Sequence, residues 1–225
     1  MNMSIPIDRL IRTRRKTIAL VIERDGSLTV RAPMKMTEAR IHDFVGRHAD
    51  WVIKHQEQAR TSPLPGSKRY IEGETFLFLG QSYPLAIVSH QRLALTFDNN
   101  AFLLAVSALP KAEQVFTRWY KTQAARVLSE RILLLSTKYD LPFGKIRITS
   151  ARTRWGSCSS RGTISFTWRL VMAPAEVVDY VVIHELVHMK IKNHSKTFWG
   201  RVEAIYPGYK KNILWLKKNG RYLTL

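Results

Sequence analysis

The sequence predicts an α+β fold with two parts, a small N-terminal region rich in β-strands and a larger C-terminal region in which helices accompany a sheet. Three observations predict this class. Short runs of alternating apolar and polar residues recur in the first half of the chain, a long helical stripe of apolar residues follows Pro110, and an alternating strand directly precedes a further helix. We expect an N-terminal α+β region over residues 1–108 and a second domain over residues 109–225.

The first elements are a hairpin and a helix. Residues 17–22 and 28–30 alternate in hydrophobicity and flank the dipeptide Asp25-Gly26, which is typical of a hairpin turn. Thr37 is a suitable N-cap, and apolar residues then recur at helical spacing up to about Gln58. The N-terminal region therefore begins as a hairpin followed by one helix.

A run rich in proline and glycine, residues 62–66, interrupts this pattern. Beyond it, Asn99-Asn100 is expected to turn two of the following strands into a hairpin. The sequence predicts a small antiparallel unit from four short β-like runs, at residues 75–79, 85–88, 93–97 and 102–106.

The second half contains longer helices. Pro110 is expected to open a helix that ends near Tyr139, because proline is favoured in the first helical turn. Pro174 is expected to open a helix with a valine stripe that continues to about Lys192. The remaining expected elements are strands at 145–150 and 163–168 and helices at 196–205 and 209–218.

The valine-striped helix carries the motif His184-Glu185-Leu186-Val187-His188. Two histidines four positions apart lie on one face of a helix, so that one metal ion can bind both imidazoles. Asn193 is suited to end the helix in a left-handed conformation, which would return His194 toward the same ion. Three imidazoles leave the fourth tetrahedral position of zinc open for water, as in catalytic rather than structural zinc sites.

Glu185 is predicted to be the general base that takes a proton from this water, and not a metal ligand. Zinc hydrolases also use two histidines and one glutamate, so Glu203 is an alternative third ligand. Otherwise Glu203 would orient an imidazole or simply face solvent. His194 is the preferred third ligand.

Composition and charge limit the cellular context. The 225-residue chain has no apolar run long enough to cross a bilayer and no secretory pattern near its start, and its single cysteine, Cys158, is compatible with a reducing compartment. We expect a cytoplasmic protein. Of the net charge of +19, residues 141–225 carry +11, which favours an anionic substrate or a partner such as nucleic acid.

Several motifs together resemble the YgjP-like metallopeptidase family, which is grouped with the zincin-like SprT and WLM metallopeptidases. The resemblance covers nearly the whole chain and is most specific in the runs Arg152–Ser159, Ile164–Leu170, Asp179–His188 and Asn193–Ser195 with Phe198-Trp199. It implies a zincin-like catalytic domain at 109–225, with an active-site helix beside a mixed or antiparallel sheet. It also implies one zinc ion on His184, His188 and His194, with Glu185 catalytic. Val187 stands where this family commonly has cysteine, and Ile191 stands where metzincins have glycine.

Residues near the motif offer ways to bind a substrate. The strand at 163–168 is a candidate for pairing with an extended peptide, and Thr163, Ser165 and Thr167 form its polar face. Arg152, Arg154 and Arg169 are candidates for gripping an anionic group. Cys158 is interpreted as a small residue in a tight turn rather than as a metal-binding thiolate.

The sequence therefore predicts a zinc-dependent hydrolase, and most directly a peptidase acting on peptides or proteins. One alternative is a metal-dependent phosphohydrolase acting on nucleotides, because water activation serves both reactions and the basic surface suits phosphate. A second is a nucleic-acid-associated binding protein of the SprT-like type. Its support is the net charge and the basic, tryptophan-containing C-terminal helix at 209–218.

Overall fold

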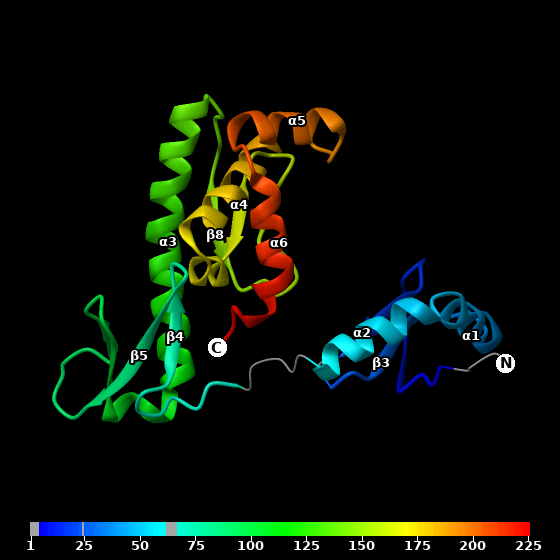
Figure 1. Cartoon of the computed structure of the whole chain (residues 1–225), viewed down its shortest axis with the longest axis horizontal. Coiled ribbons are helices and arrows are strands. Elements are labelled where there is room, and N and C mark those ends of the chain that lie inside the picture. Colours follow the sequence, from blue (N-terminus) through cyan, green and yellow to red (C-terminus); the bar gives the residue numbers. More distant parts are fainter. Residues whose placement is uncertain (1–4, 24, 62–66) are drawn as a thin grey trace. The chain divides into compact units, whose positions relative to one another are not determined.

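The computed structural model describes residues 5–23, 25–61 and 67–225. The chain divides into two compact units, Met1–Gly66 and Ser67–Leu225 (Figure 1). Each unit has its own hydrophobic core. The break expected at residues 62–66 lies outside the described residues. Within the described residues, no helix has both the length and the apolar character needed to span a membrane.

The first unit is a three-stranded sheet covered by two helices. The sheet has the order β1-β3-β2, with β1 parallel and β2 antiparallel to β3. The expected hairpin is confirmed as β2 and β3, whereas β1 was not predicted. The single helix expected from Thr37 is instead two helices, because the backbone leaves the helical region at His48 (φ −113°, ψ 22°). The element bounds are β1 Arg9–Thr13, β2 Ala19–Ile22, β3 Leu28–Pro33, α1 Glu38–Arg47 and α2 Ala49–Thr61.

The second unit begins with a four-stranded sheet of order β4-β5-β7-β6. The expected hairpin across Asn99-Asn100 is confirmed as the antiparallel pair β6 and β7. The sheet is not purely antiparallel as expected, because β5 and β7 run parallel. The strands are β4 Thr75–Phe78, β5 Gln81–Val88, β6 Leu95–Phe97 and β7 Phe102–Ala105.

This sheet shares its core with the long helix α3 (Ala112–Tyr139), which follows a short 3₁₀ helix at Val106–Lys111. The ring of Phe116 on α3 stacks on Phe76 with a centroid distance of 4.2 Å and packs against Phe102 at 5.3 Å. The hydroxyl of Tyr120 donates a hydrogen bond of 2.6 Å to the carbonyl of Leu77. Because these contacts join β4–β7 to α3, the division between the units falls after residue 66 and not after residue 108.

A second, mixed sheet and three helices complete the unit. The sheet has the order β8-β10-β9, in which β10 is parallel to β8 and antiparallel to β9. The helix α4 packs on α3, α5, α6 and β9, which confirms the expected helix beside a mixed sheet and the α+β class (Figure 1). The bounds are β8 Ile146–Thr149, β9 Gly156–Cys158, β10 Ile164–Thr167, α4 Ala175–Val187, α5 Lys196–Ile205 and α6 Tyr209–Asn219.

The turn between β4 and β5 fixes the start of α4. Leu79 and Gly80 donate backbone hydrogen bonds to the carbonyls of Val171 and Met172, with lengths of 2.8 and 3.2 Å. Gly80 has a φ of 83°, and a Cβ atom there would lie 2.8 Å from Cα of Pro174. Only glycine permits this conformation and this close approach without strain. The first sheet of the unit thus positions the helix that carries the histidines.

Candidate metal centre

His184 and His188 lie at the C-terminal end of α4. The helix ends at Val187, earlier than the expected Lys192, and His188 is its C-cap residue. The backbone N–H of His188 still donates to the carbonyl of His184 over 3.3 Å. The two imidazoles therefore remain on one side of the helix, with ring centroids 4.8 Å apart.

His194 reaches the same point from the loop that follows α4. Its Nε2 atom lies 3.0 Å from Nε2 of His184 and 3.1 Å from Nε2 of His188. Imidazole nitrogens at about 2.0–2.1 Å from a tetrahedral zinc ion are separated by roughly 3.3 Å, so the three ligand atoms fit such an ion. Asn193 is not among the described residues with positive φ, so the expected left-handed turn at Asn193 is wrong. Instead the chain turns at residues 188–190 and enters α5, where Ser195 is the N-cap.

The protonation of these rings suits metal binding, which requires neutral imidazole. Nδ1 of His188 lies 2.9 Å from the carbonyl of Ile191, and by donating to it leaves the lone pair on Nε2. Burial lowers the pKa of His184 to about 3, and His188 and His194 contribute to this shift. His184 is therefore neutral at physiological pH.

Glu203 lies exposed on α5 and is outside the group of convergent ligands. The sequence also offers Glu203 as a residue that orients an imidazole. For His188, the carbonyl of Ile191 orients the ring instead. Among the described residues, the metal-binding group consists of His184, His188 and His194.

Glu185 points its carboxylate into the protein next to β9. Its side chain is buried, and burial raises its pKa to about 7, with Arg154 opposing the shift. A Cβ atom added to Gly156 would lie 2.6 Å from Oε1 of Glu185. Gly156 therefore provides the space that this carboxylate occupies.

The sequence does not identify Gly156 as a site residue, because Cys158 is expected to lie in a tight turn and no strand is expected at β9. A glycine within a strand often marks the close approach of another group, and this signal was present in Gly156-Ser157-Cys158.

The strand expected to pair with a substrate is β10, but both of its edges are occupied. It pairs with β8 on one side and with β9 on the other. Thr167 is buried and donates a hydrogen bond of 2.8 Å from its hydroxyl to the carbonyl of Ala151. Ser165 is half-buried on β10, and Thr163 precedes the strand. Strand addition to β10 is therefore excluded, whereas β9 has a free edge in the sheet as described.

Three arginines lie around the end of this sheet. Arg152 and Arg154 are exposed, and Arg154 interacts electrostatically with Glu185. Arg169 stacks over the ring of Trp168 at 4.2 Å and donates to the carbonyl of Ser150 over 3.3 Å. Its pKa is lowered by burial and by the nearby Arg152. In the described part of the chain, none of the three forms an ion pair with a carboxylate.

Cys158 lies on β9 and not in a turn. Its sulfur is 3.5 Å from Sδ of Met189 and 3.8 Å from Nζ of Lys192. Burial raises the pKa of its thiol, an effect that Lys192 opposes. Cys158 is not part of the group of convergent ligands.

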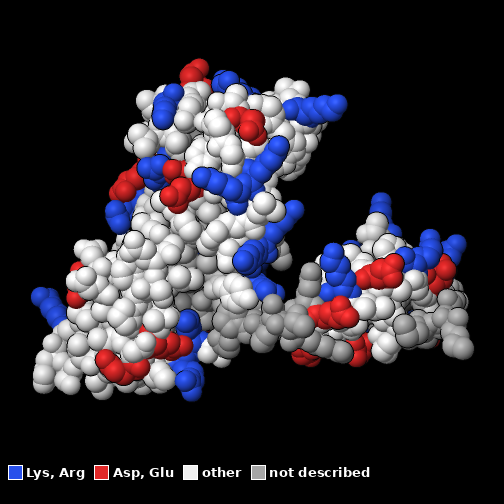
Figure 2. All heavy atoms as spheres, in the orientation of Figure 1, with Lys and Arg blue, Asp and Glu red and all other residues white. Residues whose placement is uncertain are grey.

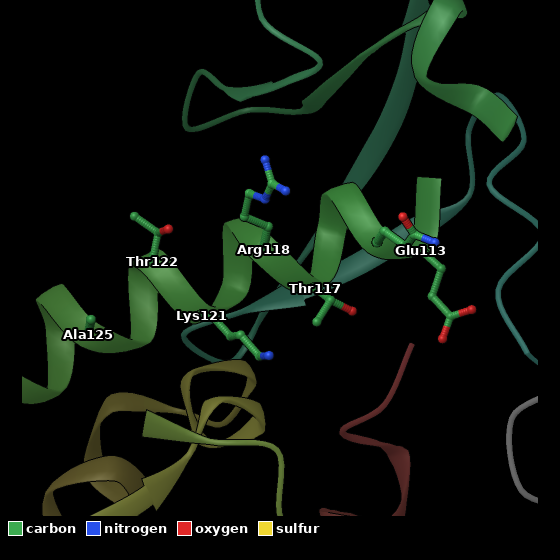
Figure 3. A pocket seen from close by; sticks show the side chains of 7 residues that line it. Glu113, Thr117, Arg118, Lys121, Thr122 and Ala125 are labelled. Atoms are coloured by element: carbon green, nitrogen blue, oxygen red, sulfur yellow. The ribbon is translucent and has the colours of Figure 1, made fainter. Parts of the chain in front are cut away.

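A hollow of about 780 Å³ elsewhere on the unit offers no comparable site (Figure 3). Its lining residues all belong to α3. Arg118 and Thr122 point to one side of the helix and Thr117 and Lys121 to the other (Figure 3), so these side chains do not converge on a ligand.

Comparison with known proteins identifies a family, and solved structures with a distant likeness to this chain include two metallopeptidase zymogens. The metallopeptidase zymogen abylysin of Pyrococcus abyssi is 28% identical, with 45% of this chain and 99% of that chain covered and a TM-score of 0.35. The metallopeptidase zymogen jannalysin of Methanocaldococcus jannaschii is 22% identical, with coverages of 44% and 95% and a TM-score of 0.34. No curated protein matches significantly. The family model described as YgjP-like, metallopeptidase domain, matches residues 16–219. This chain therefore belongs to the YgjP-like metallopeptidase family.

Proposed function

We propose that this protein is a zinc-dependent peptidase in which His184, His188 and His194 bind one zinc ion and Glu185 is the general base. The convergence of the Nε2 atoms of His184, His188 and His194 carries the proposal, together with the buried Glu185, which follows His184 on α4. Bound zinc would supply Lewis acidity, which makes water acidic enough to be deprotonated near neutral pH and polarises a carbonyl group.

The protein's own groups would divide the remaining work. Glu185, with a pKa of about 7, is able both to accept a proton from water and to release it to the leaving amine. Gly156, which has no Cβ atom, leaves the space that its carboxylate occupies. Arg154 is available near the carboxylate to stabilise negative charge that develops on the substrate.

The free edge of β9 supports a peptide as the substrate. An extended peptide can add to such an edge through backbone hydrogen bonds, and β9 begins at Gly156 next to Glu185. Pairing there would bring a peptide bond close to the catalytic carboxylate. Arg152 and Arg154, which lie four and two residues before β9, would then contact the same substrate.

The substitution Glu185→Gln tests the proposal. The variant is expected to retain one zinc ion per chain and to lose peptide hydrolysis, because an amide cannot accept the proton. Glu203→Gln is the matched control, since Glu203 is an exposed carboxylate on α5. It should keep both zinc and activity. Full activity of the Glu185→Gln variant would refute the role of Glu185, and loss of zinc from the Glu203→Gln variant would restore Glu203 as a ligand.

The phosphohydrolase alternative rests on the positive charge of the C-terminal half. Basic side chains gather over the region of α6 on the face drawn in Figure 2. Lys210, Lys211, Lys217 and Lys218 of this helix are exposed. Because this chain belongs to a metallopeptidase family, we favour the peptidase over the phosphohydrolase. Comparing peptide and nucleoside triphosphate turnover in one zinc-loaded sample separates the two, and turnover of the triphosphate alone would favour the alternative. Nucleic-acid binding and a cytoplasmic location stay predictions from charge and from the single cysteine.

A further inference from the structure

The three histidines rest on one aromatic side chain, Phe198, in the first turn of α5. Its ring is fully buried. It stacks on His188 with a centroid distance of 4.4 Å and an interplanar angle of 30°. It meets His184 and His194 edge to face, at 4.9 Å from each. One side chain thus contacts every member of the metal-binding group.

Trp199, the next residue, packs against His194, which is the exposed member of the three histidines. Its ring stacks on His194 at 5.7 Å with an angle of 25°, and it lies 5.8 Å from the ring of His184. Trp199 is itself held by stacking on Tyr209 of α6 at 5.3 Å. His194 comes from a loop, so these aromatic contacts replace the support that a helix gives to His184 and His188.

The start of α5 fixes where these rings lie. Ser195 directly follows His194, and its hydroxyl accepts a hydrogen bond of 3.4 Å from the backbone N–H of Phe198. The N-cap therefore links the position of the third histidine to the position of the two aromatic rings. A change in the first turn of α5 would move them together.

Metal binding requires all three Nε2 atoms to present a lone pair, and in that tautomeric state the rings form no hydrogen bonds with one another, so packing must hold them there. Nε2 atoms 3.0–3.1 Å apart would separate if the imidazoles were free to rotate. A side chain already held in its bound rotamer loses less conformational entropy on binding than a mobile one. We propose that Phe198 and Trp199 are positioning residues that preorganise the three histidines for zinc. Phe198 does so by packing against all three imidazoles, and Trp199 does so by stacking on His194. This inference rests on the proposed zinc site.

The test is the zinc affinity of the metal-free protein, measured by competition with a chromophoric chelator. Phe198→Leu is expected to weaken zinc binding by about ten- to a hundredfold, the range seen when groups that orient metal ligands are removed. Phe116→Leu is the matched control, because Phe116 is equally buried in the same unit and its ring contacts are other aromatic residues. It should leave zinc affinity within about twofold of the parent protein, although both substitutions lower stability.

Trp199 provides a second test that does not depend on a buried substitution. Trp199→Leu should weaken zinc binding, whereas Trp199→Phe, which keeps a flat ring, should restore most of the affinity. In a His194→Ala background, Trp199→Leu should have little further effect, because the tryptophan acts through His194. Equal zinc affinity of the parent protein and the Phe198→Leu and Trp199→Leu variants would overturn the inference and leave the zinc site intact. A parent protein that binds no zinc would overturn the proposed function itself.

Discussion

At the scale of single residues, burial determines what Glu185 can do. An exposed glutamate is ionised at neutral pH and has little tendency to hold a proton, whereas burial of Glu185 raises its pKa from an ordinary 4.5 to about 7. Arg154 limits this rise through its positive charge. A carboxylate in this range is suited to transfer protons in both directions near neutral pH.

The raised pKa predicts how pH affects the stability of the metal-free protein. Between pH 4.5 and about 7 the folded state holds a proton that the unfolded state releases, so the contribution of Glu185 to the free energy of unfolding falls as pH rises through this window. Glu185→Gln removes that dependence. At pH 8 the variant should be more stable than the parent protein by on the order of 3 kcal/mol, and at pH 4 by little. Urea unfolding at both pH values, without metal, measures this, and an equal difference at both would contradict it.

Gly156 gives a second prediction at this scale. Gly156→Ala places a methyl group where the carboxylate of Glu185 lies, so that the base must move. Because a displacement of about 1 Å can cost roughly a hundredfold in rate, kcat/KM for a peptide should fall by about that factor while zinc stays bound. Gly200→Ala is the control, because nothing lies within 4 Å of a Cβ atom there. Similar activity of the two variants would argue against this role of Gly156.

The sequence identifies the residues that follow a simple spacing rule and misses those that depend on packing. His184, Glu185 and His188 are predicted because a helix repeats every 3.6 residues. The convergence of His194 is also expected, although the turn that produces it differs from the one predicted at Asn193. The role of Gly156 arises from its contact with Glu185, which is distant in sequence, and the role of Phe198 arises from its packing against three histidines, which no spacing rule describes.

At the scale of elements, α4 is held by an ion pair with α3. Arg131 and Asp179 form a bidentate pair, with Nε of Arg131 2.6 Å from Oδ1 of Asp179, and the guanidinium also contacts Oδ2. The pKa of Arg131 is raised by its hydrogen bond to Asp179. Arg131 and Asp179 are 48 positions apart in the sequence and lie on different helices. Their ion pair therefore fixes how α4 lies on α3.

Replacing Arg131 by Met is expected to lower the free energy of unfolding by about 1–3 kcal/mol, because Asp179 then loses its partner while remaining mostly buried. Arg126→Met is the control on the same helix. Its ion pair with Glu130 is within one helix and exposed, and such pairs contribute about 0.5 kcal/mol or less. Chemical denaturation of both variants tests the difference, and equal losses would show that the α3–α4 pair has no special role.

Most helices and strands of the second unit are predicted within a few residues, because their apolar periodicity is long and regular. The bounds of α5 match the expected 196–205. The errors occur where tertiary contacts override local pattern. The three residues of β9 form a strand only by pairing with β10, and the apolar stripe after Thr37 does not show the break at His48.

At the scale of the whole molecule, the chain has two cores and the metal-binding group belongs entirely to the second. Strand β3 and helices α1 and α2 supply most of the first core, and no residue of that core belongs to the metal-binding group. The elements that position the histidines all lie in Ser67–Leu225. The domain boundary predicted from the sequence, after residue 108, places the four strands of residues 75–105 with the first domain, because a core that these strands share with α3 cannot be read from periodicity.

The second unit should therefore fold and bind zinc on its own. A fragment of residues 67–225 is expected to bind zinc with an affinity within about twofold of that of the full chain, since all three histidines and the described side chains that contact them belong to the second unit. Circular dichroism and a zinc titration check this. A folded fragment without zinc binding would show that the first unit contributes to the site.

In the proposed function, one zinc ion on three histidines supports peptide hydrolysis. The most direct measurement is a titration of the metal-free full chain with zinc while cleavage of a peptide is followed. Activity should be absent without metal, rise linearly with added zinc and saturate at one equivalent. The His194→Ala variant should gain little activity at the same zinc concentrations. Undiminished cleavage without metal, or full zinc-dependent activity in the His194→Ala variant, would contradict it.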